Sequence, residues 1–392
     1  MSRPTHSGFR LSAKPSSHGR QVILHNKTVI IILFDVIFCA NYQSSRLDGS
    51  GVSPRLPERR GMTKLMVGRR RGLRSLSAIV AAAMVFSFVS IARADDTVLR
   101  VGHFPNITHA QGLVAHALTR QGKGWFEQHM PGVTVQWYVY GAGPAAMEAM
   151  IAKSIDLSFV GPNPALNVYA KSGGDEVRVV AGAAEGGSAL VVQPDENLKS
   201  AADFRGKKIG TPQLGNTQDV AARSWLIAGG LHITQTGGDA QVIPTANPDQ
   251  LLLFKQKQLD GVWTVEPWVS RLVSEAGGKV LVDEPKALTT LLVARADFLD
   301  KQRDLVRKFV AAEQELTDWI IAHPDEAQAL VRSELKAETQ VDMAPDLVAK
   351  AWQRIHWVHD VKREQIDDVV KSAQAVGFLR GAPDLGKFIQ SP

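Results

Sequence analysis

The feature that most constrains this chain is a pattern that occurs twice along it. "RVGHFPNITHAQGLV", from Arg100, aligns with "KIGTPQLGNTQDVAA", from Lys208, at an offset of 108 residues. "SIDLSFVGPNP" aligns with "QLDGVWTVEPW" at an offset of 104, which places Asp156 on Asp260, and the prolines of "VYGAGPAAMEAM" and "PTANPDQLLLF" share that offset. Because these matches come in the same order at nearly one spacing, the sequence predicts two lobes of similar structure.

Each copy of the pattern alternates between two kinds of segment. Short apolar runs rich in Val and Ile, typical of strands, alternate with helical patterns from about residue 97 to 295. Alternating strands and helices favour an α/β fold with parallel strands. From about residue 300 to the end the pattern is helical, so a C-terminal helical segment is expected.

Residues 62–94 have the composition of an export signal. A cluster of Lys and Arg follows Met62, then comes the apolar run "SLSAIVAAAMVFSFVS", and Ala92-Arg93-Ala94 forms an A-x-A cleavage site before Asp95. The apolar run is shorter than the roughly 20 residues of a membrane span, which disfavours an anchor. Signal peptides begin a chain, so we predict that Met62 is the true start, that residues 1–61 are an upstream extension from a wrong start, and that the mature protein is periplasmic.

The net charge of +6 belongs to this front segment rather than to the body of the chain. Residues 1–94 hold 15 of the 45 Lys and Arg but only 3 of the 39 Asp and Glu, so residues 95–392 carry 30 and 36, a net charge of −6. No nucleic-acid partner is therefore expected. The single cysteine, Cys39, also precedes the cleavage site, so the mature chain is predicted to lack a disulfide, a thiolate metal site and a cysteine nucleophile.

The predicted topology places a ligand between the two lobes. In open parallel sheets ligands bind at the carboxyl ends of strands, beside helix N-termini, whose unpaired N–H groups favour anions. Six loops are expected there: 104–109, 141–144, 161–164, 212–218, 244–248 and 264–268. None of them contains Lys or Arg, so an anion held there must rely on backbone N–H groups and neutral side chains.

Within these loops each candidate side chain has two interpretations. Asn216 either caps the following helix, with Asp219 three residues on as in a capping box, or contacts ligand. Glu266 either holds an amine-bearing ligand, or caps the next helix or ties the hinge. Ligand contacts are predicted for Asn106, Thr108, His109, Gly141, Gly143, Pro162, Asn163, Gln213, Asn216, Thr217, Glu266 and Trp268. No metal site is predicted, because no helix or strand period brings His103, His109 and His116 together.

Four stretches carry a resemblance to a known family: "VGHFPNITHAQGLV", "AGPAAMEAMIAKSIDLSFVGPNPA", "FRGKKIGTPQLGNTQDVA" and "QLDGVWTVEPW". From about residue 97 to 295 the chain resembles the periplasmic solute-binding proteins of ABC importers in the nitrate, sulfonate and taurine group. The resemblance implies two mostly parallel lobes, joined by a two-strand hinge near "SALVVQP" and "TTLLVARADF", with the C-terminal helices packed on the first lobe. The implied boundaries are 97–190 plus 291–392 for the first lobe and 191–290 for the second.

The resemblance implies a receptor that closes over a small sulfonate, taurine or related oxyanion, then docks on an inner-membrane permease with its ATPase. A monomer without cofactor is expected. Two alternatives remain: a receptor for a heteroaromatic nutrient such as a thiamine precursor, favoured by the Trp residues and uncharged loops, and a periplasmic enzyme on the same fold. No G-x-S-x-G, H-E-x-x-H or P-loop motif and no cysteine occurs in residues 95–392, so no catalytic residue is predicted.

Overall fold

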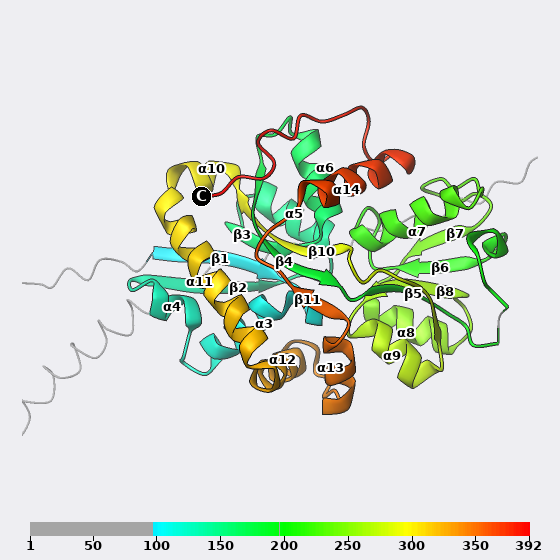
Figure 1. Ribbon diagram of the computed structural model, residues 1–392, viewed down its shortest axis with the longest axis horizontal. Helices are drawn as coiled ribbons and strands as arrows, with labels where there is room; N and C mark the ends of the chain where they lie inside the picture. Colours follow the sequence, from blue (N-terminus) through cyan, green and yellow to red (C-terminus); the bar gives the residue numbers. More distant parts are fainter. Residues whose placement is uncertain (1–96, 196) are drawn as a thin grey trace, which may run out of the picture. The chain divides into compact units, whose positions relative to one another are not determined.

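The computed structural model describes residues 97–195 and 197–392, whose strands form two sheets (Figure 1). The first sheet has the order β2 (Val133–Val139), β1 (Thr97–His103), β3 (Leu157–Val160), β10 (Leu288–Arg295), β4 (Val177–Gly186) and β11 (Ile355–Trp357). The second has the order β7 (Gln241–Pro244), β6 (Lys208–Thr211), β8 (Gly261–Val265), β5 (Ser188–Val192) and β9 (Lys279–Asp283). We call each sheet with the helices that cover it a lobe.

The helices that follow the strands cover both sheets. The first lobe carries the 3-10 turn η1 (Ile107–His109), α3 (Ala110–Arg120), α4 (Trp125–His129), α5 (Gly143–Ile151) and α6 (Pro162–Lys171). The second carries η2 (Ala201–Phe204), α7 (Thr217–Ala228), α8 (Asn247–Lys255) and α9 (Trp268–Ala276). The C-terminal segment comprises α10 (Ala296–Lys301), α11 (Arg303–Ala322), α12 (Pro324–Thr339), α13 (Pro345–Trp352) and α14 (Arg363–Ala375). The predicted α/β fold with two lobes and C-terminal helices is confirmed.

In each sheet only the three strands at one edge are parallel to one another. β1 pairs in parallel with β2 and β3, and β6 pairs in parallel with β7 and β8. The strands that enter from the other lobe, β10 and β5, pair antiparallel with β3 and β8. The prediction of mostly parallel sheets therefore holds for the repeated strand–helix units. β10 and β5, which connect the lobes, run antiparallel to their neighbours on both sides, and β11 runs antiparallel to β4.

The internal duplication reappears in matching backbone contacts. The Asp156 carboxylate accepts a hydrogen bond from the backbone N–H of Arg100 at 3.0 Å, and the Asp260 carboxylate accepts one from Lys208 at 2.7 Å. Both aspartates also donate their own N–H to the carbonyl of the same partner, at 2.8 and 2.9 Å. Asp156 thus ties the start of β3 to β1, and Asp260 ties the start of β8 to β6.

Apolar side chains from both faces of each sheet form the cores. In the first lobe, Leu99 and Val101 of β1 pack with Phe309 and Leu316 of α11, which lies over the sheet in Figure 1. The other face of that sheet packs against α5, α6 and α14. The second sheet packs against α7 on one face and against α8 and α9 on the other. The C-terminal helices thus complete the core of the first lobe.

The predicted upstream extension, residues 1–61, and the predicted signal peptide, residues 62–94, lie outside the described residues. Within residues 97–195 and 197–392, no helix combines the length and apolar character needed to cross a membrane.

Candidate functional site

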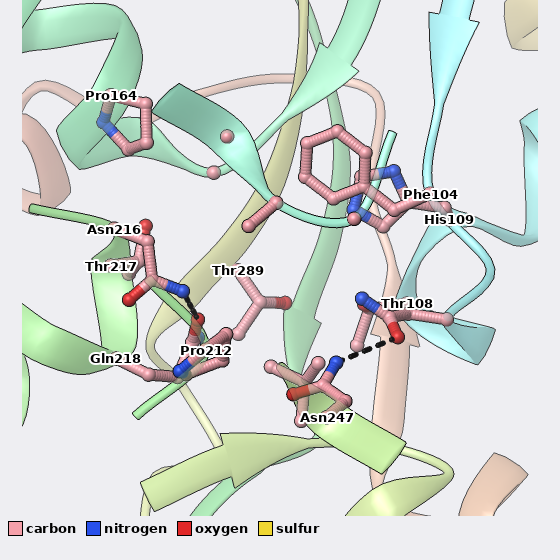
Figure 2. A pocket seen from close by; sticks show the side chains of 16 residues that line it. Phe104, Thr108, His109, Pro164, Pro212, Asn216, Thr217, Gln218, Asn247 and Thr289 are labelled. Carbon is pink, nitrogen blue, oxygen red and sulfur yellow. Dashed lines mark hydrogen bonds between the residues drawn. The ribbon is translucent and has the colours of Figure 1, made fainter. Parts of the chain in front are cut away.

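A small cavity lies between the two lobes, and all six predicted loops contribute to its wall (Figure 2). Its lining residues are Phe104, Asn106, Thr108, His109, Gly141, Ala142, Gly143, Gly161, Pro164, Pro212, Asn216, Thr217, Gln218, Asn247, Val265 and Thr289. The cavity has a volume of about 20 Å³, which is room for roughly one water molecule. The lobes therefore lie close together in this structure and leave little room between them.

Four helices begin at this cavity. α5 begins at Gly143 and α8 at Asn247, and Gly161 and Asn216 immediately precede α6 and α7. The first N–H groups of a helix have no partner within it, and the helix dipole makes that end positive. Among the described residues, those that line the cavity include no Lys, Arg, Asp or Glu. The wall thus offers an anion neutral hydrogen-bond donors and the positive ends of helices.

Asn216 serves as a cap and lines the cavity at once. Its Oδ1 accepts a hydrogen bond from the backbone N–H of Asp219 at 2.9 Å, and its Nδ2 donates to Oε1 of Gln218 at 3.1 Å. The Asp219 carboxylate does not complete a capping box with Asn216, because it accepts from the backbone N–H of Gly215 and from Oγ1 of Thr211. The sequence left cap and ligand contact as alternatives; the cap is present, and the amide also faces the cavity.

Two buried polar atoms at the cavity have no hydrogen-bond partner: Nδ1 of His109 in the first lobe and Oγ1 of Thr217 in the second. Burial and the nearby His103 hold the pKa of His109 well below its usual value, so its imidazole is neutral. The His109 ring lies on Phe104 with a centroid distance of 4.3 Å. Because unpaired buried polar groups are costly, these two atoms favour a polar solute that reaches both lobes.

Asn106 joins the two lobes directly. Its Oδ1 accepts hydrogen bonds from Nε1 of Trp268 at 3.0 Å and from Nδ2 of Asn247 at 3.4 Å. Beside it, the backbone N–H of Ile107 donates to the carbonyl of Glu266 at 3.0 Å. These contacts exist only while the lobes are closed, so they stabilise the closed arrangement.

Glu266 lies outside the cavity wall, and its carboxylate has partners within the protein. It accepts hydrogen bonds from the backbone N–H and Oγ of Ser270, at 3.1 and 3.0 Å, and forms an ion pair with Nε of Arg354 at 2.9 Å. Burial raises the pKa of Glu266 to about 7. The carboxylate thus caps α9 and ties the second lobe to the segment between α13 and β11. In this arrangement it gives no support to an amine-bearing ligand.

The cavity wall includes some of the predicted contact residues and omits others. Seven of them line it: Asn106, Thr108, His109, Gly141, Gly143, Asn216 and Thr217. The other five, Pro162, Asn163, Gln213, Glu266 and Trp268, are not part of that wall. Asn163 faces a separate cavity with Val220, and Trp268 contributes through its bond to Asn106.

The wall also includes residues outside the predicted set of ligand contacts, namely Phe104, Ala142, Gly161, Pro164, Pro212, Gln218, Asn247, Val265 and Thr289. All but Thr289 fall within the six predicted loops, so the loop positions were the available signal. Thr289 lies on β10, and its Oγ1 donates to the carbonyl of Ala184 at 3.1 Å. A strand residue of this kind carries no turn or cap signal in the sequence.

The two lobes and the closed polar cavity between them define the class, a two-lobed α/β binding protein. The chain belongs to the NMT1-like family, whose model matches residues 92–337.

Comparison with known proteins gives the same class. A binding protein of Brucella abortus (strain 2308) is 27% identical over 267 residues, which are 66% of this chain and 78% of that protein. The taurine-binding periplasmic protein of Escherichia coli (strain K12) is 24% identical over 200 residues, 50% of this chain and 60% of that one. The alkanesulfonate-binding protein of Xanthomonas axonopodis pv. citri, bound to MOPS, has a TM-score of 0.62 at 17% identity, and the match covers 76% of this chain and 100% of that one. That structural match shows the fold alone.

Proposed function

We propose that this protein is the periplasmic substrate-binding receptor of an ABC importer and that it closes over a small sulfonate, taurine or a related oxyanion. The observation that carries the proposal is the convergence of four helix starts on one uncharged, closed cavity between two lobes. Helix N-termini and neutral donors suit a small oxyanion. The names of the taurine-binding and alkanesulfonate-binding relatives support the same class of solute.

The mechanism is lobe closure. An oxyanion bound to one open lobe meets donors of the other lobe only when the cleft shuts, so its contacts favour the closed state over the open one. His109 and Thr217, on opposite sides, are the side chains whose unpaired atoms a solute would satisfy. The closed monomer then docks on the inner-membrane permease, whose ATPase drives release; no cofactor takes part.

A thermal-shift screen of the purified protein tests the choice of solute. Taurine, alkanesulfonates, nitrate, bicarbonate and pyrimidines are compared, since a solute that binds only the native state raises the melting temperature. The expected result is a shift with taurine or an alkanesulfonate. A shift with pyrimidines alone would contradict the proposal and favour a heteroaromatic nutrient, for which the Phe104 ring at the cavity is the supporting observation.

A second measurement separates a receptor from an enzyme on the same fold. The solute that shifts the melting temperature is incubated with the protein and recovered after denaturation. A receptor returns it unchanged at one equivalent per chain, whereas accumulating product would overturn the receptor proposal. Stimulation of the ATPase of the reconstituted importer by the loaded protein tests the permease partnership.

A further inference from the structure

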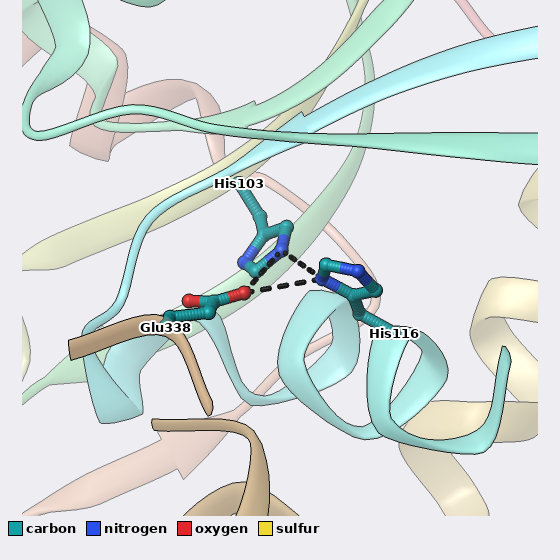
Figure 3. A group of neighbouring side chains, drawn as sticks. All are labelled: His103, His116 and Glu338. Atoms are coloured by element: carbon teal, nitrogen blue, oxygen red, sulfur yellow. Dashed lines mark hydrogen bonds and ion pairs between the residues drawn. The ribbon is translucent and has the colours of Figure 1, made fainter. Parts of the chain in front are cut away.

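Three side chains from distant parts of the first lobe meet behind the cavity wall (Figure 3). His103 ends β1, His116 lies on α3 and Glu338 lies on α12. The imidazole of His103 is fully buried, and the side chains of His116 and Glu338 are 11% and 2% exposed. In Figure 3 the ring nitrogens and one carboxylate oxygen point toward a common centre.

The three atoms at that centre form a nearly equilateral triangle. Nε2 of His103 lies 3.1 Å from Nδ1 of His116, and each of these nitrogens lies 3.1 Å from Oε1 of Glu338. An ion bonded at roughly 2.0–2.1 Å to three atoms so spaced would have ligand–metal–ligand angles of about 100°, near the tetrahedral value that Zn²⁺ adopts. The triangle therefore matches one face of a zinc coordination tetrahedron.

Hydrogen bonding alone satisfies this cluster poorly when both imidazoles are neutral. Nδ1 of His103 faces the carbonyl of Phe104 at 3.4 Å, and because a carbonyl only accepts, that nitrogen carries the proton and Nε2 is left as an acceptor. Nδ1 of His116 then faces three acceptors: Nε2 of His103, Oε1 of Glu338 and Oε1 of Glu334 at 2.9 Å. A single proton on that nitrogen cannot serve all three. A cation at the centre would satisfy every one of these atoms.

We propose that His103, His116 and Glu338 bind one Zn²⁺ ion, with Glu334 or water in the fourth position. Two imidazoles and one carboxylate form a donor set that Zn²⁺ uses. The contact of His103 with Phe104 fixes the tautomer that leaves Nε2 free, as an outer-shell partner of a metal ligand does. Glu334 is held in place by Nε of Arg120 at 2.8 Å. The partial exposure of the His116 side chain provides an entry path.

This proposal differs from the sequence-based prediction of no metal site, which considered only the three histidines. His109 instead lines the cavity between the lobes, and the third ligand comes from α12, 222 residues after His116. An ion at this place would cross-link α12 to β1 and α3, directly behind the loop that starts at Phe104. Its role is to stabilise the first lobe and to hold one wall of the cavity, whatever solute the cavity takes.

Titration of the chelator-treated protein with zinc chloride tests the proposal. We expect binding of one Zn²⁺ per chain and a rise in melting temperature on addition of metal. Co²⁺ in place of Zn²⁺ is expected to give the visible absorption bands of tetrahedral cobalt. Glu338→Gln, which keeps the size of the side chain and removes its negative charge, is expected to weaken Zn²⁺ affinity at least tenfold. The matched control is His129→Gln, on the exposed end of α4, which should leave affinity and stoichiometry unchanged.

Three results would overturn the proposal. Failure of the wild-type protein to bind Zn²⁺ at one equivalent would show that hydrogen bonds and ion pairs alone hold the cluster together. Unchanged affinity in Glu338→Gln would place the ion elsewhere, as would a loss of affinity in His129→Gln. If Glu338→Gln fails to fold, His103→Gln replaces it as the test variant. The stoichiometry of Zn²⁺ binding and the cobalt spectrum of the wild-type protein then decide whether the site exists. None of these outcomes depends on which solute the cavity between the lobes binds.

Discussion

Trp268 of the second lobe donates a hydrogen bond from Nε1 to Oδ1 of Asn106 in the first lobe, over 3.0 Å. Both side chains are almost fully buried, at 4% and 5% exposure. The indole therefore links the lobes beside the cavity without belonging to its wall. This bond gives closure an energetic contribution that is independent of the solute.

Replacing Trp268 by Phe keeps an aromatic ring and removes the donor. Loss of one such hydrogen bond, leaving the Asn106 oxygen with a weaker partner, costs about 1 kcal/mol, which is roughly a fivefold loss of solute affinity. The melting temperature of the unliganded protein is expected to change less than the affinity. Calorimetric titration with the solute that gives the largest thermal shift measures the effect. Trp319→Phe, on α11 away from the cleft, is the control and should leave affinity unchanged.

Gly161 permits the close approach of the lobes. A Cβ atom at this position would lie 2.4 Å from Oγ1 of Thr217 across the cleft. Its φ of −69° and ψ of 154° suit any residue, so Gly161→Ala should fold normally in the open form. We expect affinity to fall by a factor of ten or more while the melting temperature of the free protein stays close to that of the wild type.

The combination Gly161→Ala with Thr217→Ala identifies the cause. Removal of the Thr217 oxygen relieves the contact, so adding Gly161→Ala to Thr217→Ala should cost much less affinity than adding it to the wild type. Equal costs in the two backgrounds would show that Gly161 acts in another way.

The location of the site followed from the sequence more readily than its individual contacts. Parallel strands and duplicated units fix which loops meet, so all six predicted loops reach the cavity. The direction of each side chain depends on partners far along the chain. Arg354 takes the Glu266 carboxylate away from the cleft, and Glu338 meets His116 only after α12 has packed on α3. Thr289 lies in a strand, where no local signal marks a binding residue.

Two substitutions at Asn216 separate its roles as cap and as cavity wall. Asn216→Ala removes the acceptor for the Asp219 N–H and should lower stability by about 1 kcal/mol. Asn216→Asp keeps an acceptor there but adds a negative charge to the wall. If the solute is an oxyanion, Asn216→Asp should retain wild-type stability and lose affinity through like-charge repulsion. An unchanged affinity in Asn216→Asp, measured by calorimetry, would argue against an anionic solute at this wall.

The duplicated aspartates are expected to differ in their contribution to stability. Asp156 is 2% exposed and also binds Arg100 at 2.7 Å and Arg295 at 3.1 Å. Asp260 is 23% exposed, and its shortest contact is the backbone N–H of Lys208. Asp156→Ala leaves the buried Arg295 and the partly exposed Arg100 short of a partner and should cost about 3 kcal/mol. Asp260→Ala should cost about 1 kcal/mol. Urea unfolding measures both, and equal losses would contradict this comparison.

Glu313 gives the first lobe a pH-dependent stability. The side chain is fully buried on α11, where Oγ1 of Thr317 donates to it at 3.1 Å, and burial raises the pKa of Glu313 to about 8. In the unfolded chain the carboxyl ionises near pH 4.5, so between about pH 4.5 and 8 only the native state holds this proton. Stability should therefore fall as pH rises through this window, by up to about 1.4 kcal/mol per pH unit, and level off above it.

Glu313→Gln replaces the titrating group by a neutral one of the same size. The substitution should make the fall in stability between pH 5 and 8 less steep, with a gain over the wild type that is largest at pH 8 and close to zero at pH 5. Urea unfolding across this range measures the slope. Glu315→Gln, two residues along the same helix and 64% exposed, is the matched control and should keep the wild-type slope. Parallel curves for Glu313→Gln and the wild type would show that the Glu313 carboxyl does not retain its proton in the folded protein.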